Sequence, residues 1–333
     1  MTIFDMPRCS LGLLPTPLER MYNLEKYLGI SNLYIKRDDL TGLGLSGNKV
    51  RKLEFLVQDA INKGCTTLLT YGGPQTNHGR LTAAAAVKKG MKCILILEGK
   101  KPEYCSGNII LDKLMGADLY FTEDDPQAKA REVIEQYEKN GEKIYEIGPG
   151  GSNDVGVLGY IFMVKELIEQ FEEQKISPKY LVTASGSLGT FCGLWLGAKY
   201  FNAEFDVVPV AVNPKTKFRE KLAADLINQA SAKYNMGITC TEEELKINMN
   251  YAGLGYNIPD KDTQEAMRIL SATEAIFVDP CYTGKSFYGY LDLVQNTFGN
   301  GAGAVYLHTG GVPAIWTKEH LDSMQEKFWG DGK

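Results

Sequence analysis

The stretch from Ser46 to Glu54, Ser-Gly-Asn-Lys-Val-Arg-Lys-Leu-Glu, contains a lysine that could act as a nucleophilic amine. Gly47 lets the chain turn sharply, because glycine adopts positive φ without steric cost. Lys49 then opens a predicted helix, and the helix dipole disfavours a positive charge at that end. The neutral amine is the form that attacks a carbonyl carbon to give a Schiff base. The same residues also fit a solvated lysine in an ordinary first turn, so this stretch alone leaves both interpretations open.

A second stretch, Ser185-Gly186-Ser187-Leu188-Gly189-Thr190, could bind an anion. It lies between a predicted strand and a predicted helix. Its glycines would let backbone N–H groups converge on a phosphate, which the dipole of the following helix also favours. It matches neither the G-x-x-x-x-G-K-[ST] nor the G-x-G-x-x-G nucleotide pattern. It therefore predicts either a phosphate site without nucleotide-binding machinery or a tight turn without a ligand.

Two further stretches have polar residues at the start of a predicted helix. Gln75-Thr76-Asn77-His78 would present the first N–H groups of its helix to a cavity, which suits a carboxylate or a ring hydroxyl. It also fits a simple helix cap by Thr76 or Asn77. The stretch from Asp279 to Lys285 could be an ordinary turn into a helix, and Tyr256 could be an ordinary core residue.

Strands and helices alternate along the chain. Predicted strands lie near residues 33–36, 66–70, 93–97, 119–121, 180–183, 207–212 and 304–308. Predicted helices lie near residues 49–60, 81–89, 108–115, 126–139, 154–173, 190–200, 218–233 and 262–271, with another after 285. This order predicts an α/β fold of open twisted parallel sheets with helices on both faces. Ligands in such folds bind beyond the carboxyl ends of strands, where the glycine-rich stretches fall.

Composition excludes several classes of protein. A chain of 333 residues with 44% hydrophobic residues predicts about two globular domains. The net charge of -5 argues against a nucleic-acid partner. We expect no secretory signal and no membrane span, since no long apolar run occurs. The seven cysteines form no C-x-x-C pair and only three histidines are present, which predicts reduced cytoplasmic thiols and no metal site.

Taken together, these stretches resemble the fold-type-II pyridoxal 5'-phosphate (PLP) enzymes, the tryptophan synthase β-like group. Within it they are similar to the D-cysteine desulfhydrase / 1-aminocyclopropane-1-carboxylate (ACC) deaminase family. The resemblance spans residues 14–316 and is carried by Lys36–Gly42, Gly47–Leu56, Gln75–His78 and Asp279–Lys285. It implies a large PLP-binding domain of residues 1–49 and 164–333, and a small inserted α/β domain of residues 50–163. It also implies an active site in the cleft between them, and a homodimer.

The resemblance implies a role for each residue around the cofactor. Lys49 would form the Schiff base with PLP. The cofactor phosphate would be held by Lys52 and by the glycine-rich loop, namely Ser185, Gly186, Ser187, Leu188, Gly189 and Thr190. Asn77 would bond the ring hydroxyl, and Tyr282 would stack on the pyridine ring.

On the substrate side, the resemblance implies that Tyr256 and Tyr282 face the substrate. Thr76, with the N–H groups of Asn77 and His78 behind it, would bind the substrate carboxylate. The family has serine where this chain has Thr76. The extra methyl group would narrow that end of the pocket, which leaves another substrate such as cysteate open.

Two positions separate the branches of the family. In the deaminase branch, a glutamate follows the stacking tyrosine and a leucine follows the histidine of the last strand. This chain has Thr283 at the first of these positions and Thr309 at the second. A carboxylate would keep the pyridine nitrogen protonated, giving the deep electron sink that ring opening needs. The threonines favour β-elimination, most simply of D-cysteine to pyruvate, ammonia and hydrogen sulfide. ACC deamination and a non-catalytic PLP-binding protein are the alternatives, although Lys49, Tyr282 and a substrate-side Tyr256 argue against the second, since binding alone does not need them.

Overall fold

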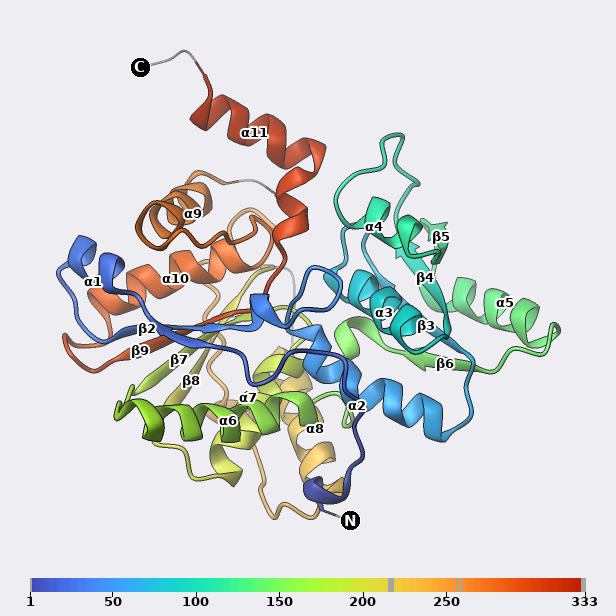
Figure 1. Cartoon of the computed structure of the whole chain (residues 1–333), viewed down its shortest axis with the longest axis horizontal. Coiled ribbons are helices and arrows are strands. Elements are labelled where there is room, and N and C mark those ends of the chain that lie inside the picture. The colour runs from blue at the N-terminus through green and yellow to red at the C-terminus, as the bar shows by residue number, and fades with distance from the viewer. Residues whose placement is uncertain (1, 215–218, 256, 259, 331–333) are drawn as a thin grey trace.

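The computed structural model describes residues 2–214, 219–255, 257–258 and 260–330, so the predicted substrate-side Tyr256 lies outside the described residues. Two sheets dominate the fold (Figure 1). The five-stranded sheet has the order β1 (Leu18–Arg20), β2 (Leu33–Arg37), β9 (Ala304–His308), β7 (Tyr180–Ser185) and β8 (Asp206–Ala211). Only β1 pairs antiparallel; the other pairs are parallel. This sheet therefore joins the two ends of the chain.

The four-stranded sheet comes from the intervening segment. Its order is β5 (Asp118–Thr122), β4 (Lys92–Glu98), β3 (Thr67–Gly72) and β6 (Ile144–Ile147), and all its pairs are parallel. The inner residues of β3 and β4 are buried, as expected for parallel strands covered on both faces. The α/β class and the parallel sheets predicted from the sequence are confirmed. The domain boundaries at residues 49, 50, 163 and 164 stay a prediction.

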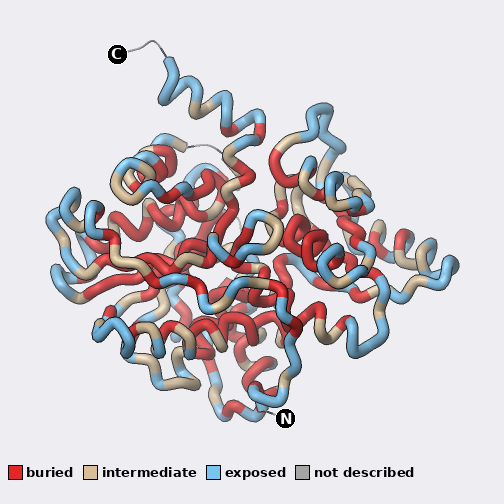
Figure 2. Tube along the Cα trace, in the orientation of Figure 1, coloured by how far each residue is buried: buried red, intermediate tan, exposed pale blue. Residues whose placement is uncertain are grey.

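Helices cover both sheets. They are α1 (Tyr22–Leu28), α2 (Lys49–Asn62), α3 (Asn77–Lys88), α4 (Asn108–Leu114), α5 (Pro126–Glu138), α6 (Leu158–Gln174), α7 (Gly189–Tyr200), α8 (Arg219–Lys233), α9 (Lys261–Glu274), α10 (Thr283–Asn296) and α11 (Lys318–Phe328). One hydrophobic cluster contains Leu53 of α2, Leu81 of α3, Leu158 of α6 and Phe191 of α7. Figure 2 shows buried chain concentrated around the strands and the start of α2, and exposed chain on α5 and α11. The core is therefore continuous where the two sheets meet.

Helix α2 is fixed at this junction by a buried ion network. The Arg51 guanidinium bonds the Asp38 carboxylate (Nε to Oδ2, 2.8 Å) and the Glu166 carboxylate (Nη1 to Oε2, 2.8 Å). Burial by itself would raise the pKa of Asp38, but the charge and hydrogen bonds of Arg51, the charge of Lys36 and the hydrogen bond from Tyr160 together outweigh it, and the pKa lies below its usual value. The network joins the first turns of α2 to α6, so it sets the position of Lys49.

The structure corrects the predicted start of one helix. The helix predicted from residue 154 begins at Leu158, because the Asn153 side chain accepts hydrogen bonds from the N–H groups of Val155 and Gly156 and favours a turn there. The sequence analysis also missed β1, β6, α1 and α11. Within the described ranges, no helix is long and apolar enough to cross a membrane.

Candidate active site

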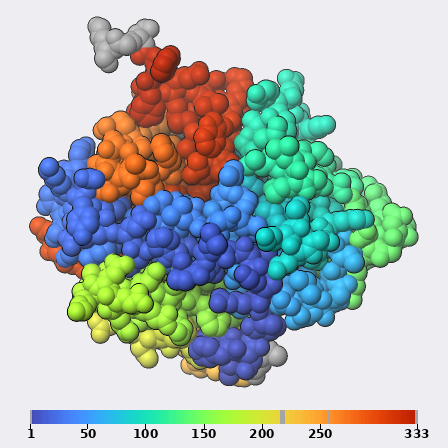
Figure 3. Space-filling view, viewed as in Figure 1, coloured from blue at the N-terminus to red at the C-terminus, as the bar shows by residue number. Residues whose placement is uncertain are grey.

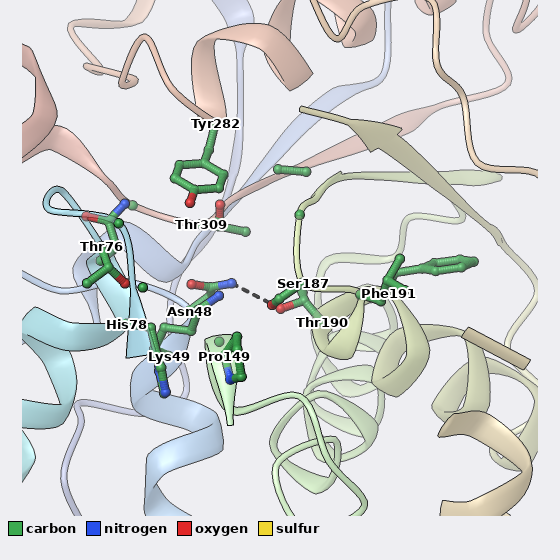
Figure 4. Close-up of a pocket in the computed structure, with 18 of the residues that line it drawn as sticks. Asn48, Lys49, Thr76, His78, Pro149, Ser187, Thr190, Phe191, Tyr282 and Thr309 are labelled. Atoms are coloured by element: carbon green, nitrogen blue, oxygen red, sulfur yellow. Dashed lines mark hydrogen bonds between the residues drawn. The ribbon is translucent and has the colours of Figure 1, made fainter. Parts of the chain in front are cut away.

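Segments that follow β3, β6, β7 and β9 meet around a cavity of about 170 Å³ (Figure 4). The predicted site residues that line it are Lys49, Thr76, Asn77, His78, Gly186, Ser187, Leu188, Thr190, Tyr282 and Thr309. Lys52, Ser185, Gly189 and Thr283 are not among its lining residues. Since each segment leaves the carboxyl end of its strand, the cavity lies where parallel α/β sheets bind ligands.

Lys49 is the first residue of α2 and faces this cavity. The chain reaches it through Gly47, whose φ is 135° and where a Cβ atom would lie 3.1 Å from the Thr309 carbonyl oxygen. Burial lowers the pKa of the Lys49 amine to about 8. The sequence analysis attributed the neutral amine to the helix dipole, whereas burial is the main cause in the structure. Lys49 can therefore be substantially neutral at mildly alkaline pH.

Lys52 lies one turn further along α2 and is completely buried. Its Nζ donates to the Gly150 carbonyl (3.2 Å), and no carboxylate of the described residues forms a salt bridge with it. Burial, followed by the charge of Lys49, lowers the pKa of Lys52 well below its usual value. A Cβ atom on Gly189 would lie 2.9 Å from this amine. A buried amine beside the glycine-rich loop is what a phosphate group requires.

Two glycine-rich loops pack against each other behind Lys52. Gly150 has φ +67°, and a Cβ there would lie 2.1 Å from the Ser187 hydroxyl. The Ser152 hydroxyl donates to that of Ser187 (2.9 Å) and accepts from the N–H of Gly189 (3.2 Å), where α7 begins. The close approach leaves no room for larger residues and keeps backbone N–H groups near the cavity.

The start of α3 combines a helix cap with cavity-lining groups. The Thr76 hydroxyl accepts from the N–H of Gly79 (3.2 Å), which confirms the predicted cap. A hydroxyl that accepts one bond still has its own proton to donate. The Asn77 Oδ1 accepts from the Asn108 amide (3.0 Å).

His78 is buried, and neither ring nitrogen has a hydrogen-bond partner among the described residues. Burial, with the charges of the two nearby lysines, lowers the pKa of His78 well below its usual value, so the ring is neutral.

Tyr282 lies across the cavity from Lys49, and Thr76 and Ser187 flank them on either side (Figure 4). Tyr282 precedes α10, and the Asp279 carboxylate accepts its N–H (2.9 Å) together with the N–H groups of Cys281 and Thr283. The Thr283 hydroxyl is buried and donates to Asp279 as well. Asp279 thus fixes the turn that presents the tyrosine ring.

The sequence analysis missed several residues of this site. Asn48 lines the cavity, and its amide donates to the Thr190 hydroxyl (3.0 Å), which joins the two glycine-rich segments. Pro149 and Gly150 line it too. The run Gly148-Pro149-Gly150-Gly151 had a signal in its three glycines, but the strand before it, β6, was not predicted either. Asp279 had a weaker signal, since an aspartate before a helix usually indicates only a cap.

The fold and the site are suited to an enzyme that binds a phosphorylated cofactor beside a lysine. The residues fit PLP: Lys49 faces the cavity, Lys52 has no anionic partner among the described residues, and the glycine-rich loops leave room for a phosphate group. The family model described as "Pyridoxal-phosphate dependent enzyme" matches residues 9–310, and the chain belongs to that family. PLP is therefore its cofactor, as the resemblance implied.

Similar proteins narrow the class further. The chain is 39% identical to a protein of Pyrococcus abyssi provisionally named 1-aminocyclopropane-1-carboxylate deaminase, over 93% of each chain. It is 36% identical to the D-cysteine desulfhydrase of Salmonella paratyphi B, over 93% of this chain and 95% of that protein. A crystal structure described as an ACC deaminase homologue superposes with a TM-score of 0.87 at 33% identity, covering 97% of both chains. The predicted family and the PLP-dependent lyase class are confirmed.

A more distant structure supports the fold alone. The processed form of threonine deaminase isoform 2 from Solanum lycopersicum superposes with a TM-score of 0.67 at 14% identity, covering 98% of this chain and 85% of that one. The predicted fold-type-II architecture is therefore confirmed across proteins of low sequence similarity.

Proposed function

We propose that this enzyme eliminates the β-substituent of a β-substituted amino acid, and that D-cysteine is the substrate, giving pyruvate, ammonia and hydrogen sulfide. One observation carries the choice over ACC: no aspartate or glutamate lines the described part of the cavity. Position 283 carries a neutral hydroxyl group, and Thr309 lines the wall. Without a carboxylate beside the pyridine nitrogen, the ring is the weaker electron sink that suits departure of a good leaving group.

The cofactor, when bound, supplies the electron sink that stabilises negative charge at the substrate α-carbon. Lys49 acts as the base that takes the α-proton, since burial places the pKa of its amine at about 8. The Thr76 hydroxyl and the N–H groups at the start of α3 hold the substrate carboxylate. Lys52 and the glycine-rich loop would hold the cofactor phosphate, and Asn77 would bond its ring hydroxyl. Tyr282 would stack on the pyridine ring.

The position of Thr76 bears on cysteate as an alternative substrate. Its methyl carbon lies 2.5 Å from where a Cβ atom on Gly79 would be, and 3.0 Å from the same position on Gly72. The methyl group therefore packs between these glycines, which weakens the argument that it narrows the carboxylate end of the pocket. Without that narrowing, Thr76 gives no reason to prefer cysteate over cysteine.

A substrate screen tests the proposal. The purified holoenzyme is incubated with D- and L-cysteine, D- and L-cysteate, β-chloroalanine and ACC, and pyruvate, sulfide, ammonia and 2-oxobutanoate are measured. We expect equal amounts of pyruvate and sulfide from D-cysteine and little 2-oxobutanoate from ACC, with no turnover by Lys49→Ala. Efficient 2-oxobutanoate formation would identify an ACC deaminase instead. A holoprotein that turns over none of these compounds would support the non-catalytic alternative.

We also propose a homodimer, which light scattering after size-exclusion chromatography would identify by a mass twice that of the chain. Cytoplasmic location likewise stays a prediction from the cysteine pattern.

A further inference from the structure

The turn before Lys49 has an unusual backbone. Four successive residues have left-handed φ values: Gly44 (+50°), Leu45 (+61°), Ser46 (+62°) and Gly47 (+135°). Leu45 and Ser46 are not glycines, and other L-residues adopt this conformation only at a cost in energy. Neighbouring groups therefore have to hold the turn, and in doing so they hold the start of α2.

A buried guanidinium group from α3 bonds this turn. Arg80 donates from Nη1 to the Gly44 carbonyl and from Nη2 to the Ser46 carbonyl (3.2 Å). Arg80 is completely buried. Burial lowers its pKa to about 10, so the guanidinium group still carries its charge at neutral pH. Hydrogen bonds from a charged donor are stronger than those from a neutral one, and these two stabilise the strained turn.

Arg80 also bonds Asn77, which lines the active-site cavity. Asn77 Oδ1 accepts from Arg80 Nη2 (3.4 Å) and from Asn108 Nδ2 (3.0 Å). These two donors set the orientation of the amide, because exchanging its oxygen and nitrogen would bring N–H groups against N–H groups. The amide nitrogen lies instead on the side of the segment that follows β9, where a Cβ atom on Gly311 would be 3.2 Å from it.

An ion pair would be a simpler reason for a buried arginine, but the hydrogen bonds oppose it. Asp112 of α4 is the acid whose charge acts most strongly on Arg80, yet neither of its carboxylate oxygens has a hydrogen-bond partner among the described residues. Burial raises the pKa of Asp112 to about 8, so this group is largely neutral at neutral pH. The guanidinium group instead bonds the turn and Asn77.

The network lies beside a wide cleft but is shielded from it. Figure 3 shows the teal segment that includes α4 next to the red C-terminal segment, at the top of the molecule. The cleft has a volume of about 1300 Å³ and is lined by Gly107 and Ile109, on either side of Asn108, and by residues of α11. Asn108 itself is completely buried, and its Nδ2 also donates to the Gln75 carbonyl (2.8 Å). Water therefore does not compete for the bond to Asn77, which strengthens it.

We propose that Arg80 is a positioning residue of the cofactor site. It holds the left-handed turn before Lys49 and, together with Asn108, keeps the N–H group of the Asn77 amide facing the cavity, where the ring hydroxyl of PLP would accept it. This role rests on the proposed function, which assigns Asn77 to that hydroxyl. A single guanidinium group then connects the residue that would bond the cofactor to the residue that would orient its ring.

Two ligands separate this role from a general structural one. The apoprotein is titrated with PLP and with 3-deoxypyridoxal 5'-phosphate, which lacks only the ring hydroxyl. A loss of affinity for both ligands reports damage to the turn or to the fold. A change in the ratio of their dissociation constants reports the bond from Asn77. Hydrogen exchange of residues 44–48 in the apoprotein reports the turn directly.

The variants remove one contact at a time. Arg80→Met removes every donor of the guanidinium group, and Asn108→Ala removes the other donor to Asn77. Asn108→Ala still tests the amide orientation if Arg80→Met does not fold. Asn77→Ala is the reference, in which the bond to the ring hydroxyl is absent. The control is Arg268→Met, at an arginine of α9 whose side chain is 46% exposed.

We expect wild type to bind PLP more tightly than the analogue. Arg80→Met, Asn108→Ala and Asn77→Ala should each lower this preference about two- to tenfold, the effect of one hydrogen bond. Adding Arg80→Met to Asn77→Ala should lower it no further. Exchange in residues 44–48 should become faster in Arg80→Met and stay unchanged in Asn108→Ala. Arg268→Met should match wild type.

The two proposals fail in different ways. A wild-type preference in both Arg80→Met and Asn108→Ala would overturn the orienting role, and unchanged exchange in Arg80→Met would overturn its hold on the turn. A wild-type preference in Asn77→Ala would overturn the contact on which the proposal rests. If wild type does not turn over D-cysteine, the proposed substrate is wrong, while binding and exchange, which need no turnover, still decide the role of Arg80.

Discussion

Gly189→Ala is the most direct test of the predicted phosphate site. The added methyl carbon would lie 2.6 Å from the Ser152 hydroxyl, 2.8 Å from the Ser152 Cβ and 2.9 Å from the Lys52 amine. The amine can move, but the Ser152 Cβ can move only with its backbone. Overpacking of this kind costs roughly 1–3 kcal/mol. If that cost falls on the bound state, the dissociation constant for PLP rises about 5- to 150-fold.

The assay is titration of the apoprotein with PLP, followed by the visible absorption band. Thermal unfolding is measured with and without cofactor as well. A ligand that binds only the folded state raises the free energy of unfolding, and tighter binding raises it more. We expect the increase in melting temperature on PLP binding to shrink in Gly189→Ala. Gly299→Ala is the control, since no heavy atom lies within 4 Å of its Cβ position and it is remote from the loop. Wild-type affinity in Gly189→Ala, or an equal loss in both variants, would refute the assignment.

Three further predictions follow from the same structure. The rate at which the apoprotein binds PLP covalently should rise about tenfold per pH unit below pH 8 and level off above it. Lys49 has a pKa of about 8, and only its neutral amine attacks. A rate independent of pH between 6 and 9 would contradict this prediction. In the double variant Thr283→Glu, Thr309→Leu, the ratio of 2-oxobutanoate formed from ACC to pyruvate formed from D-cysteine should rise about tenfold to a hundredfold. This change is equivalent to roughly 1–3 kcal/mol in the relative barriers. An unchanged ratio would show that these positions do not select the reaction. Arg51→Ala should lower the free energy of unfolding by about 3–5 kcal/mol in urea denaturation, since the buried Asp38 carboxylate loses its salt bridge and Glu166 keeps only its salt bridge to Lys36. Lys221→Ala at an exposed pair should have no measurable effect.

Local patterns in the sequence predicted the parts of the site that depend on local structure. Lys49 follows a glycine-rich turn and opens a helix, and the Ser185–Thr190 loop follows a buried strand, so residue type and spacing made both of them candidates and the family resemblance chose between their two interpretations. Gly148–Gly151 was not identified in this way, because the strand before it, β6, was not predicted. These segments meet because the carboxyl ends of parallel strands lie close together.

The contacts that hold these segments in place could not be predicted in this way. Asn48 bonds a threonine 142 positions away, and Arg51 bonds a glutamate 115 positions away. Such pairs have no periodic signal, since each partner resembles an ordinary polar residue of its own segment. His320 belongs to a helix that was missed altogether, and it bonds an asparagine 63 positions away.

Borohydride reduction of the holoenzyme followed by peptide mapping shows which lysine carries the cofactor. The protein should be yellow, and reduction should remove the visible band and fix one cofactor per chain. Lys36, Lys52 and Lys285 are also buried lysines and provide internal controls. We expect the cofactor on Lys49 alone and no labelling of Lys49→Ala. A label on another lysine, or a protein that cannot be reconstituted with PLP, would contradict it.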